Sequence, residues 1–239
     1  MPKLTVVFDN IPLEPGLQTD WGFAAVVAGF AKTILFDTGA NADTLLANME
    51  ALEIDPIDIG TVVLSHPHDD HIGGLAGFLR VNPNVEVFVP DGVPCEVIEQ
   101  IERMGAEPLL VGEGGEIVQD VWTTGPIFNS TVEQGLVLIA DGETALVTGC
   151  AHPGIDVMVE EAARASGATV QLVIGGFHLL KHSKRAAQRT AKKLRDLGVE
   201  RVAPSHCTGK KAIEGLLKVF DDGFVESGLG HVIELGEGR

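Results

Sequence analysis

Short apolar segments, separated by glycine, proline and polar residues, recur along the amino-terminal half of the chain. Apolar runs of four to eight residues that end in turn residues are typical of buried β-strands. Such runs predict strands over residues 4–8, 23–27, 33–36, 61–64 and 85–89. Helical spacing, clearest for Leu45, Leu46, Met49 and Leu52, predicts helices over residues 41–52, 75–79 and 94–104.

The carboxy-terminal half repeats this order of elements. Short strands broken by glycine are expected over residues 109–111, 117–118, 121–122, 135–140 and 144–148, with a hairpin turn at Asp141-Gly142. Helices and strands then alternate, with helices over 156–165, 183–197 and 212–219 and strands over 170–174, 201–203 and 231–235. In both halves a meander of strands is followed by strands that alternate with helices. We therefore expect a mixed α/β (α+β) fold of two sheets packed face to face, with helices outside.

The composition of the chain indicates how many domains it has and in which cellular compartment it is expected. No linker-like or low-complexity segment interrupts the 239 residues, so we expect one domain over residues 1–239. No apolar run approaches the roughly 20 residues that a membrane span needs, and the amino terminus does not resemble a signal peptide. Cys95, Cys150 and Cys207 form no paired framework, which favours a reducing cytoplasm.

The charge of the chain bears on its partners. Its 34 acidic and 17 basic residues give a formal net charge of −17, and a nucleic-acid-binding surface needs the opposite sign. We therefore expect a small-molecule substrate, no nucleic acid and no membrane, and the sequence predicts no oligomeric state. Two bound divalent ions would offset about four negative charges locally, so the substrate can itself be anionic.

The most informative segment is Ser65-His66-Pro67-His68-Asp69-Asp70-His71, which follows a predicted strand and precedes Gly73-Gly74. This position predicts a loop at the carboxyl end of a strand, where open α/β sheets place their sites. Imidazole and carboxylate groups are ligands of divalent transition metals. His66 and His68 can face one ion, while Asp70 and His71, past the turn, can face a second.

Further histidines also follow predicted strand ends. His152, with Cys150 beside it, His178 and His206 each come directly after such a strand, whereas His231 begins a strand and His182 lies on a solvated face. One such histidine is more often structural than a ligand. Several at the same kind of position predict one shared metal site.

These motifs, together with Asp37-Thr38-Gly39 at another strand end, resemble the metallo-β-lactamase superfamily over essentially the whole chain. The resemblance implies a four-layer αββα sandwich built from two repeats. A narrower group resembles this chain more closely, that of metal-dependent hydrolases and 7,8-dihydropterin-6-methyl-4-(β-D-ribofuranosyl)aminobenzene-5′-phosphate synthase of methanopterin biosynthesis. The segments that carry this likeness are 21–23, 149–154, 175–179 and 206–209.

The resemblance implies two divalent metal ions, of which Zn²⁺ is preferred over Mn²⁺, Fe²⁺ or Mg²⁺. Asp37 would not bind an ion itself but would hold the metal-binding loop in place. The first ion would be bound by His66, His68 and His152, and the second by Asp70, His71 and His206.

This chain departs from the superfamily pattern at two places. The loop that usually supplies the third histidine, here residues 123–126, contains none, so His152 would take that place from a later loop. The aspartate that usually bridges the ions corresponds to Cys150. Its thiolate would bridge the ions, or Cys150 would only pack and leave the bridge to water or to His178.

The resemblance also implies an activity. A hydroxide held by the ions would attack a small ester, phosphoester or lactone, with Asp70 or His178 carrying the proton. Trp21 and Phe177 would stack on a flat substrate ring, although core packing explains them equally well. The alternatives are a pterin-methyl transferase of methanopterin-type biosynthesis and a non-catalytic metal-binding module. Replacing His68 or His206 by alanine is expected to abolish activity with little effect on folding.

Overall fold

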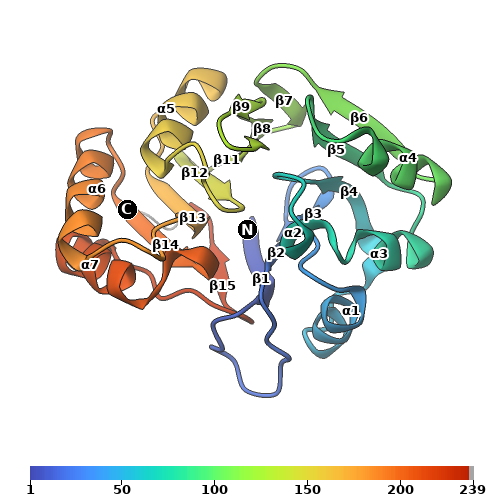
Figure 1. Cartoon of the computed structure of the whole chain (residues 1–239), viewed down its shortest axis with the longest axis horizontal. Coiled ribbons are helices and arrows are strands. Elements are labelled where there is room, and N and C mark those ends of the chain that lie inside the picture. The colour runs from blue at the N-terminus through green and yellow to red at the C-terminus, as the bar shows by residue number, and fades with distance from the viewer. Residues whose placement is uncertain (237–239) are drawn as a thin grey trace.

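The computed structural model describes residues 1–236, and two β-sheets form the centre of the molecule (Figure 1). Within these residues the first sheet has seven strands and the second has six. The first sheet runs in the order β15 (Val232–Glu234), β1 (Lys3–Asp9), β2 (Phe23–Ala28), β3 (Thr33–Phe36), β4 (Ile59–Val63), β5 (Glu86–Pro90) and β6 (Glu107–Val111). The second runs in the order β14 (Arg201–Ser205), β13 (Leu172–Gly176), β12 (Glu143–Thr148), β11 (Leu136–Ala140), β8 (Val121–Thr123) and β7 (Gly115–Val118).

Both sheets change from antiparallel to parallel pairing along the chain. In the first, β1, β2 and β3 pair antiparallel, and β3 to β6 pair parallel. In the second, β7, β8, β11 and β12 pair antiparallel, and β12 to β14 pair parallel. The predicted repeat of a meander followed by strands alternating with helices is thus confirmed. The predicted hairpin at Asp141-Gly142 is also present, with positive φ at both residues as its tight turn requires.

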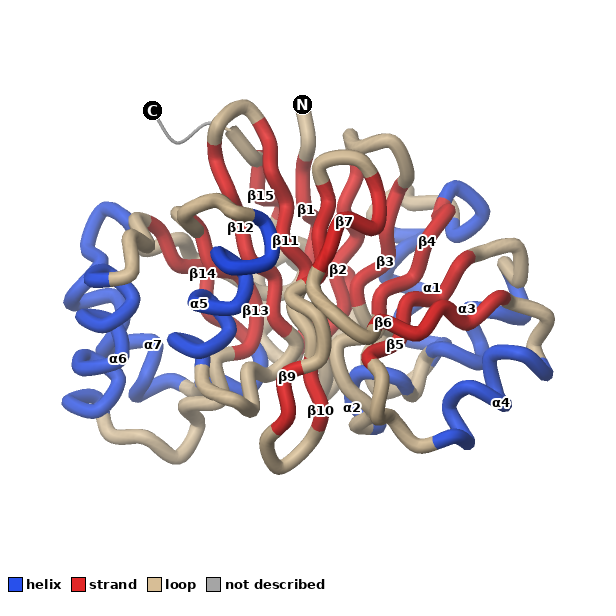
Figure 2. Tube along the Cα trace, turned by 90° about the horizontal axis from the view of Figure 1, so that it is seen from above, coloured by secondary structure: helices blue, strands red, loops and turns tan. Residues whose placement is uncertain are grey.

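Helices cover the outer face of each sheet (Figure 2). Alternate residues of β2 show how this arises: Phe23, Ala25 and Val27 pack between the sheets, while Ala24 and Val26 pack toward helices. The first sheet is covered by α1 (Ala42–Ala51), α3 (Leu75–Val81) and α4 (Cys95–Arg103), and the second by α5 (Ile155–Ser166), α6 (Lys184–Asp196) and α7 (Lys210–Phe220). The four-layer αββα sandwich is confirmed.

None of the helices within residues 1–236 combines the length and the apolar composition that a bilayer-crossing segment needs. The described residues also form three short 3₁₀ helices: η1 (Pro56–Asp58), η2 (His206–Thr208) and η3 (Asp221–Gly223).

Two local predictions differ from the structure. Asp70 and His71 lie on a short helix, α2 (Asp69–Ile72), and not in a loop, because the carbonyl of His68 accepts hydrogen bonds from the backbone N–H groups of His71 and Ile72. A two-stranded ribbon of β9 (Ile127–Phe128) and β10 (Val132–Glu133) was not predicted, because strands of two residues are too short to show a periodic pattern. Figure 2 shows this ribbon projecting at the end of the molecule where the ligand-bearing segments lie.

Candidate metal centre

The candidate ligands come from segments that follow four parallel strands. His66 and His68 follow β4, and α2 carries Asp70 and His71 directly after them. The other three segments follow β12, β13 and β14 and carry Cys150 and His152, His178, and His206. Because parallel strands of one sheet end at the same edge, and the two sheets pack face to face, segments far apart in sequence meet at one place.

His66, His68 and His152 form the first group of donors. Their ligand atoms all lie within 4.8 Å of one another. The ring of His66 is 4.7 Å, centroid to centroid, from the rings of His68 and His152. His66 is buried and His68 is exposed, so one side of this group opens to solvent. These are the three residues that the resemblance assigns to the first ion.

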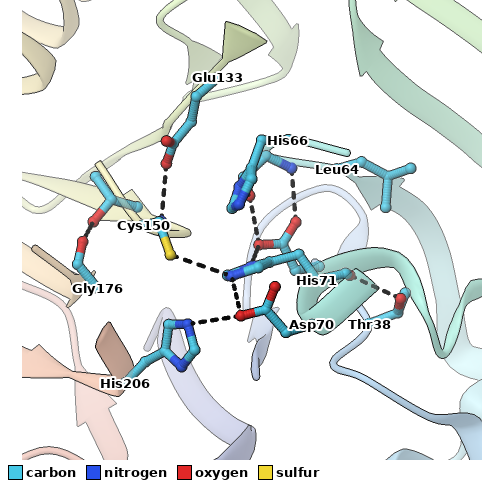
Figure 3. A network of polar contacts seen from close by, with 12 residues as sticks. Thr38, Leu64, His66, Asp70, His71, Glu133, Cys150, Gly176 and His206 are labelled. Carbon is cyan, nitrogen blue, oxygen red and sulfur yellow. Dashed lines mark hydrogen bonds and ion pairs between the residues drawn. The ribbon is translucent and has the colours of Figure 1, made fainter. Parts of the chain in front are cut away.

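Asp70, His71 and His206 form the second group, also within 4.8 Å. Oδ2 of Asp70 lies 3.6 Å from Nε2 of His71 and 3.4 Å from Nε2 of His206 (Figure 3). These are the residues assigned to the second ion. Their role as ligands stays a prediction, but the structure brings both sets together.

Cys150 lies between the two groups. Its Sγ is 3.5 Å from Nε2 of His71, and it forms a further group of close donor atoms with His66 and His71 (Figure 3). Since His66 belongs to the first group and His71 to the second, this sulfur lies where one donor can approach both.

Four of the five candidate ligand histidines, all but His68, are oriented by hydrogen bonds at Nδ1. Such a bond fixes the ring and directs Nε2 into the site. The partners are Ser65 Oγ for His66 (2.8 Å), Asp37 Oδ2 for His71 (2.7 Å), Glu133 Oε2 for His152 (2.8 Å) and Asn10 Oδ1 for His206 (2.8 Å). Asp37 thus lies behind the ligand segment, at the place expected for a supporting carboxylate.

Two buried ring nitrogens show whether the residues of this site are suited to bind metal ions. Nε2 of His66 and Nε2 of His206 are buried and have no hydrogen-bond partner among the described residues. A buried unsatisfied polar atom costs free energy, on the order of 1–3 kcal/mol. A divalent cation bound by these lone pairs removes that cost, and a histidine-rich set with one carboxylate and one thiol suits zinc-type ions. The residues present therefore fit the metal ions that the resemblance implies.

Glu133, at the end of β10, was not predicted as part of the site. Its buried carboxylate accepts hydrogen bonds from the backbone N–H groups of Cys150, Ala151 and His152 and from Nδ1 of His152. One side chain therefore shapes the segment that carries two candidate ligands. Neither the spacing of Glu133 nor its two-residue strand distinguishes it in the sequence. Asn10 was also not predicted as part of the site, and the only signal for it in the sequence is its position directly after β1.

The backbone is strained at this centre. Asp37, Ala151, His178 and His206 all have positive φ, between 46° and 59°, although none of them is glycine. Residues other than glycine hold this conformation at a cost of order 1–3 kcal/mol, and such residues cluster at functional sites.

Burial and charge oppose each other in setting the pKa values of the carboxylates. Burial raises the pKa of Asp70, but the adjacent imidazoles of His206 and His71 outweigh it and lower that pKa to about 2. Burial also raises the pKa of Glu133, and the hydrogen bonds from His152 reverse this and lower it. Burial lowers the pKa of His66. Two anionic carboxylates and a neutral imidazole are the forms that bind or orient cations.

A cavity of about 300 Å³ opens beside the donors and includes Trp21, His68, Asp70 and His178 in its lining. His178 is exposed, and its ring centroid is 4.4 Å from that of His152. Trp21 is 46% exposed, and its ring centroid lies 4.9 Å from that of His206. Both residues therefore lie where a substrate at the donors would touch them.

Phe177 does not lie in this cavity, which corrects the prediction that it stacks on the substrate. Its side chain is 1% exposed and packs in the core between the second sheet and its helices. Both residues lie beyond the end of β13, and His178 has a positive φ of 53°, so the backbone turns there and His178 lines the cavity while Phe177 packs in the core. His182, expected on a solvated face, is exposed and lies at the rim of the cavity.

A family model described as the metallo-beta-lactamase superfamily matches residues 22–206. The chain belongs to the metallo-beta-lactamase superfamily. It is 30% identical, over 86% of this chain and 85% of the relative, to a Methanocaldococcus jannaschii protein named 7,8-dihydropterin-6-methyl-4-(beta-D-ribofuranosyl)-aminobenzene-5'-phosphate synthase.

Solved structures agree with this assignment. Tm1679, described as a metal-dependent hydrolase of the beta-lactamase superfamily, is 26% identical with a TM-score of 0.81, over 98% of this chain and 99% of that one. The short form of human tRNase Z is 14% identical with a TM-score of 0.66, over 98% of this chain and 99% of that one, and shows the shared fold alone.

Proposed function

We propose that this protein is a dinuclear metal-dependent hydrolase that cleaves a small anionic ester, phosphoester or lactone. The observation that carries the proposal is the pair of three-residue donor groups that lie side by side at one cavity, with Cys150 between them. A closed, thiolate-rich site would instead favour a structural role for the metal. Here His68 is exposed and the cavity reaches the donors, so a substrate can approach them.

His66, His68 and His152 would hold one ion, and Asp70, His71 and His206 the other. Two divalent ions at such a site supply Lewis acidity and a water of lowered pKa. The donor set favours Zn²⁺, because imidazole and thiol suit it better than they suit Mg²⁺.

His178 is the residue best placed to carry a proton. It is exposed in the cavity next to His152, and its Nδ1 and Nε2 are not required by either three-residue group. Asp70 is the second candidate, but its carboxylate already lies between His71 and His206. We therefore assign to His178 the role of donating a proton to the leaving group.

The cavity supports a substrate with an apolar face and a negative charge. Trp21 and Leu180 offer apolar surface in its lining, while Lys181 and His182 line its rim. The part of the chain that the structure describes gives Lys181 no ion-pair partner. In a chain with a net charge of −17, a free ammonium group beside the donors favours an anionic substrate.

A transferase is the second candidate function, because the relative from Methanocaldococcus jannaschii is named as a synthase and matches most of this chain. That reaction requires two substrates in one site at once. A cavity of about 300 Å³ is at the lower end of the range for small-molecule sites. The cavity therefore fits one small substrate better than two, and we place hydrolysis first.

The test is turnover by the metal-loaded protein of a panel of phosphodiesters, phosphomonoesters and lactones, run in ¹⁸O-labelled water. Hydrolysis predicts products that carry the label, metal at two ions per chain, and loss of turnover in His68→Ala. Coupling of a dihydropterin diphosphate to an aminobenzene ribofuranosyl phosphate without label would establish the transferase. Two bound ions with neither hydrolysis of the panel nor the coupling reaction would support a non-catalytic metal-binding module. A chain that binds no metal would overturn the hydrolase, the transferase and the metal-binding module alike.

A further inference from the structure

Two cysteines of the molecule face each other behind the metal centre. Cys150 follows β12, and Cys207 lies in η2 after β14. Their sulfur atoms form, with a ring nitrogen of His206, a group of donor atoms within 4.8 Å of one another. The thiol of Cys207 also donates to the carbonyl oxygen of Cys150 at 3.6 Å. Only Cys150 lies between the two three-residue donor groups, and Cys207 belongs to neither of them.

Gly176, at the end of the intervening strand β13, makes this approach possible. A Cβ atom on Gly176 would lie 2.7 Å from Sγ of Cys207 and 3.2 Å from Cα of Cys150. A larger residue would therefore push the two cysteines apart. The absence of a side chain at this position leaves the two thiols in direct reach of each other.

Both thiols remain accessible to a small reagent. Cys150 is 4% exposed and Cys207 is 5% exposed, yet both line the cavity that opens beside the donors. Cys95, the third cysteine, is exposed on α4. A small neutral oxidant can thus enter the cavity and meet two thiols, whereas at Cys95 it meets one.

We propose that Cys150 and Cys207 form a peroxide-sensitive thiol pair that closes to a disulfide. One thiol attacks hydrogen peroxide, which breaks the O–O bond and gives a sulfenic acid and one water. The second thiol then attacks that sulfur, forms the S–S bond and releases the second water, so two thiols are oxidised and one peroxide is reduced. The sulfurs must close from at most 4.8 Å to a bond of about 2.05 Å.

The disulfide would also act on the metal centre, and this second part rests on the proposed function. Sγ of Cys150 is now 3.5 Å from Nε2 of His71, between the two donor groups. Bonding to Cys207 draws that sulfur toward β14 and removes it as a donor. We expect oxidised protein to release metal and reduced protein to retain it.

The test treats purified full-length protein with hydrogen peroxide, both as isolated and after removal of metal by a chelator. Intact mass, free-thiol count and peptide mapping are compared for wild type, Cys207→Ser and Cys95→Ser. Cys95→Ser should lose two thiols and the mass of two hydrogen atoms, and in both wild type and Cys95→Ser the peptide map should show Cys150 and Cys207 in one linked peptide. Cys207→Ser should form no such link and should add oxygen at Cys150.

Wild-type protein that keeps both thiols free, or that adds oxygen separately to each without a link, would overturn the proposal. The chelator-treated sample decides this without reference to the metal or to activity, and the wild-type peptide map decides it even if Cys207→Ser fails to fold. Metal content before and after oxidation, and after reduction by dithiothreitol, tests the second part. A disulfide that forms without loss of metal would overturn the link to the metal centre.

Discussion

The Nδ1 atom of His71 lies 2.7 Å from Oδ2 of Asp37, and both side chains are completely buried. The same carboxylate accepts hydrogen bonds from the backbone N–H and the hydroxyl of Ser65. Burial lowers the pKa of His71, but the adjacent Asp37 outweighs it and raises that pKa. Asp37 therefore connects the two ends of the ligand segment and directs Nε2 of His71 toward the second donor group.

We expect Asp37→Asn to weaken metal binding at the second group by about 10- to 100-fold. The amide keeps the shape of the carboxylate but lacks its charge and presents a donor where His71 needs an acceptor. Competition with a chromogenic chelator measures the affinity. Asp58→Asn, the same change at an exposed position, is the matched control and should leave the affinity unchanged. Equal affinities for wild type and Asp37→Asn would contradict the orienting role.

Glu133 permits a test that separates the two donor groups. Glu133→Gln retains one carbonyl acceptor but loses the charge and the second acceptor oxygen that hold His152. We expect metal content to fall from two ions toward one per chain, with the second group still occupied. Metal analysis after gel filtration measures this, with Glu99→Gln, exposed on α4, as the control. Loss of both ions together, or of neither, would show that Glu133 does not act through the first group.

The sequence predicts the donor groups that meet at this centre, and the supporting Asp37, better than it predicts the supports Asn10 and Glu133. His66 to His71 form one local motif, and the later histidines follow strand ends that periodicity reveals. The supporting contacts are long-range instead: Asn10 bonds to His206 across 196 residues, and Glu133 bonds to His152 from a strand of two residues. Such pairs depend on how the sheets pack, which no local pattern records. Phe177 shows the same limit, because its neighbour His178 faces the cavity while Phe177 faces the core.

Replacing His68 and replacing His206 should differ in their effect on folding, and the burial of His206 corrects the expectation that both changes leave folding nearly unaffected. His68 is exposed and makes no helix-capping hydrogen bond, so His68→Ala should abolish turnover with little loss of stability. His206 is 1% exposed and its Nδ1 bonds to Oδ1 of Asn10, so His206→Ala leaves a cavity and an unpaired amide oxygen. We expect the second change to cost about 1–3 kcal/mol in the metal-free protein. Urea unfolding of the two metal-free variants beside wild type measures the difference, and equal midpoints would contradict it.

Lys181 should act on substrate binding and not on the chemical step. Its ammonium group lies at the rim of the cavity, near His178 but outside the donor groups. For an anionic substrate of the panel, Lys181→Gln should raise KM several-fold with little change in kcat. Added salt should raise KM in wild type more than in the variant, because it screens the same attraction. Lys192→Gln, on the solvent-exposed face of α6, is the control. A variant with unchanged KM would remove Lys181 from substrate recognition.

His231 gives a pH dependence that is separate from the metal centre. Burial lowers the pKa of His231, and its Nδ1 is buried without a hydrogen-bond partner among residues 1–236. The unfolded chain takes up a proton near the ordinary pKa of about 6.5, while the folded chain does so only at lower pH. Below about pH 6.5 the unfolded state therefore binds more protons, and the free energy of unfolding falls as the pH falls. His231→Gln removes this contribution, so in metal-free protein its urea midpoint should drop less than that of wild type between pH 7.5 and pH 5.5. His182→Gln, at an exposed histidine, should follow wild type, and parallel pH profiles for His231→Gln and wild type would show that His231 titrates alike in both states.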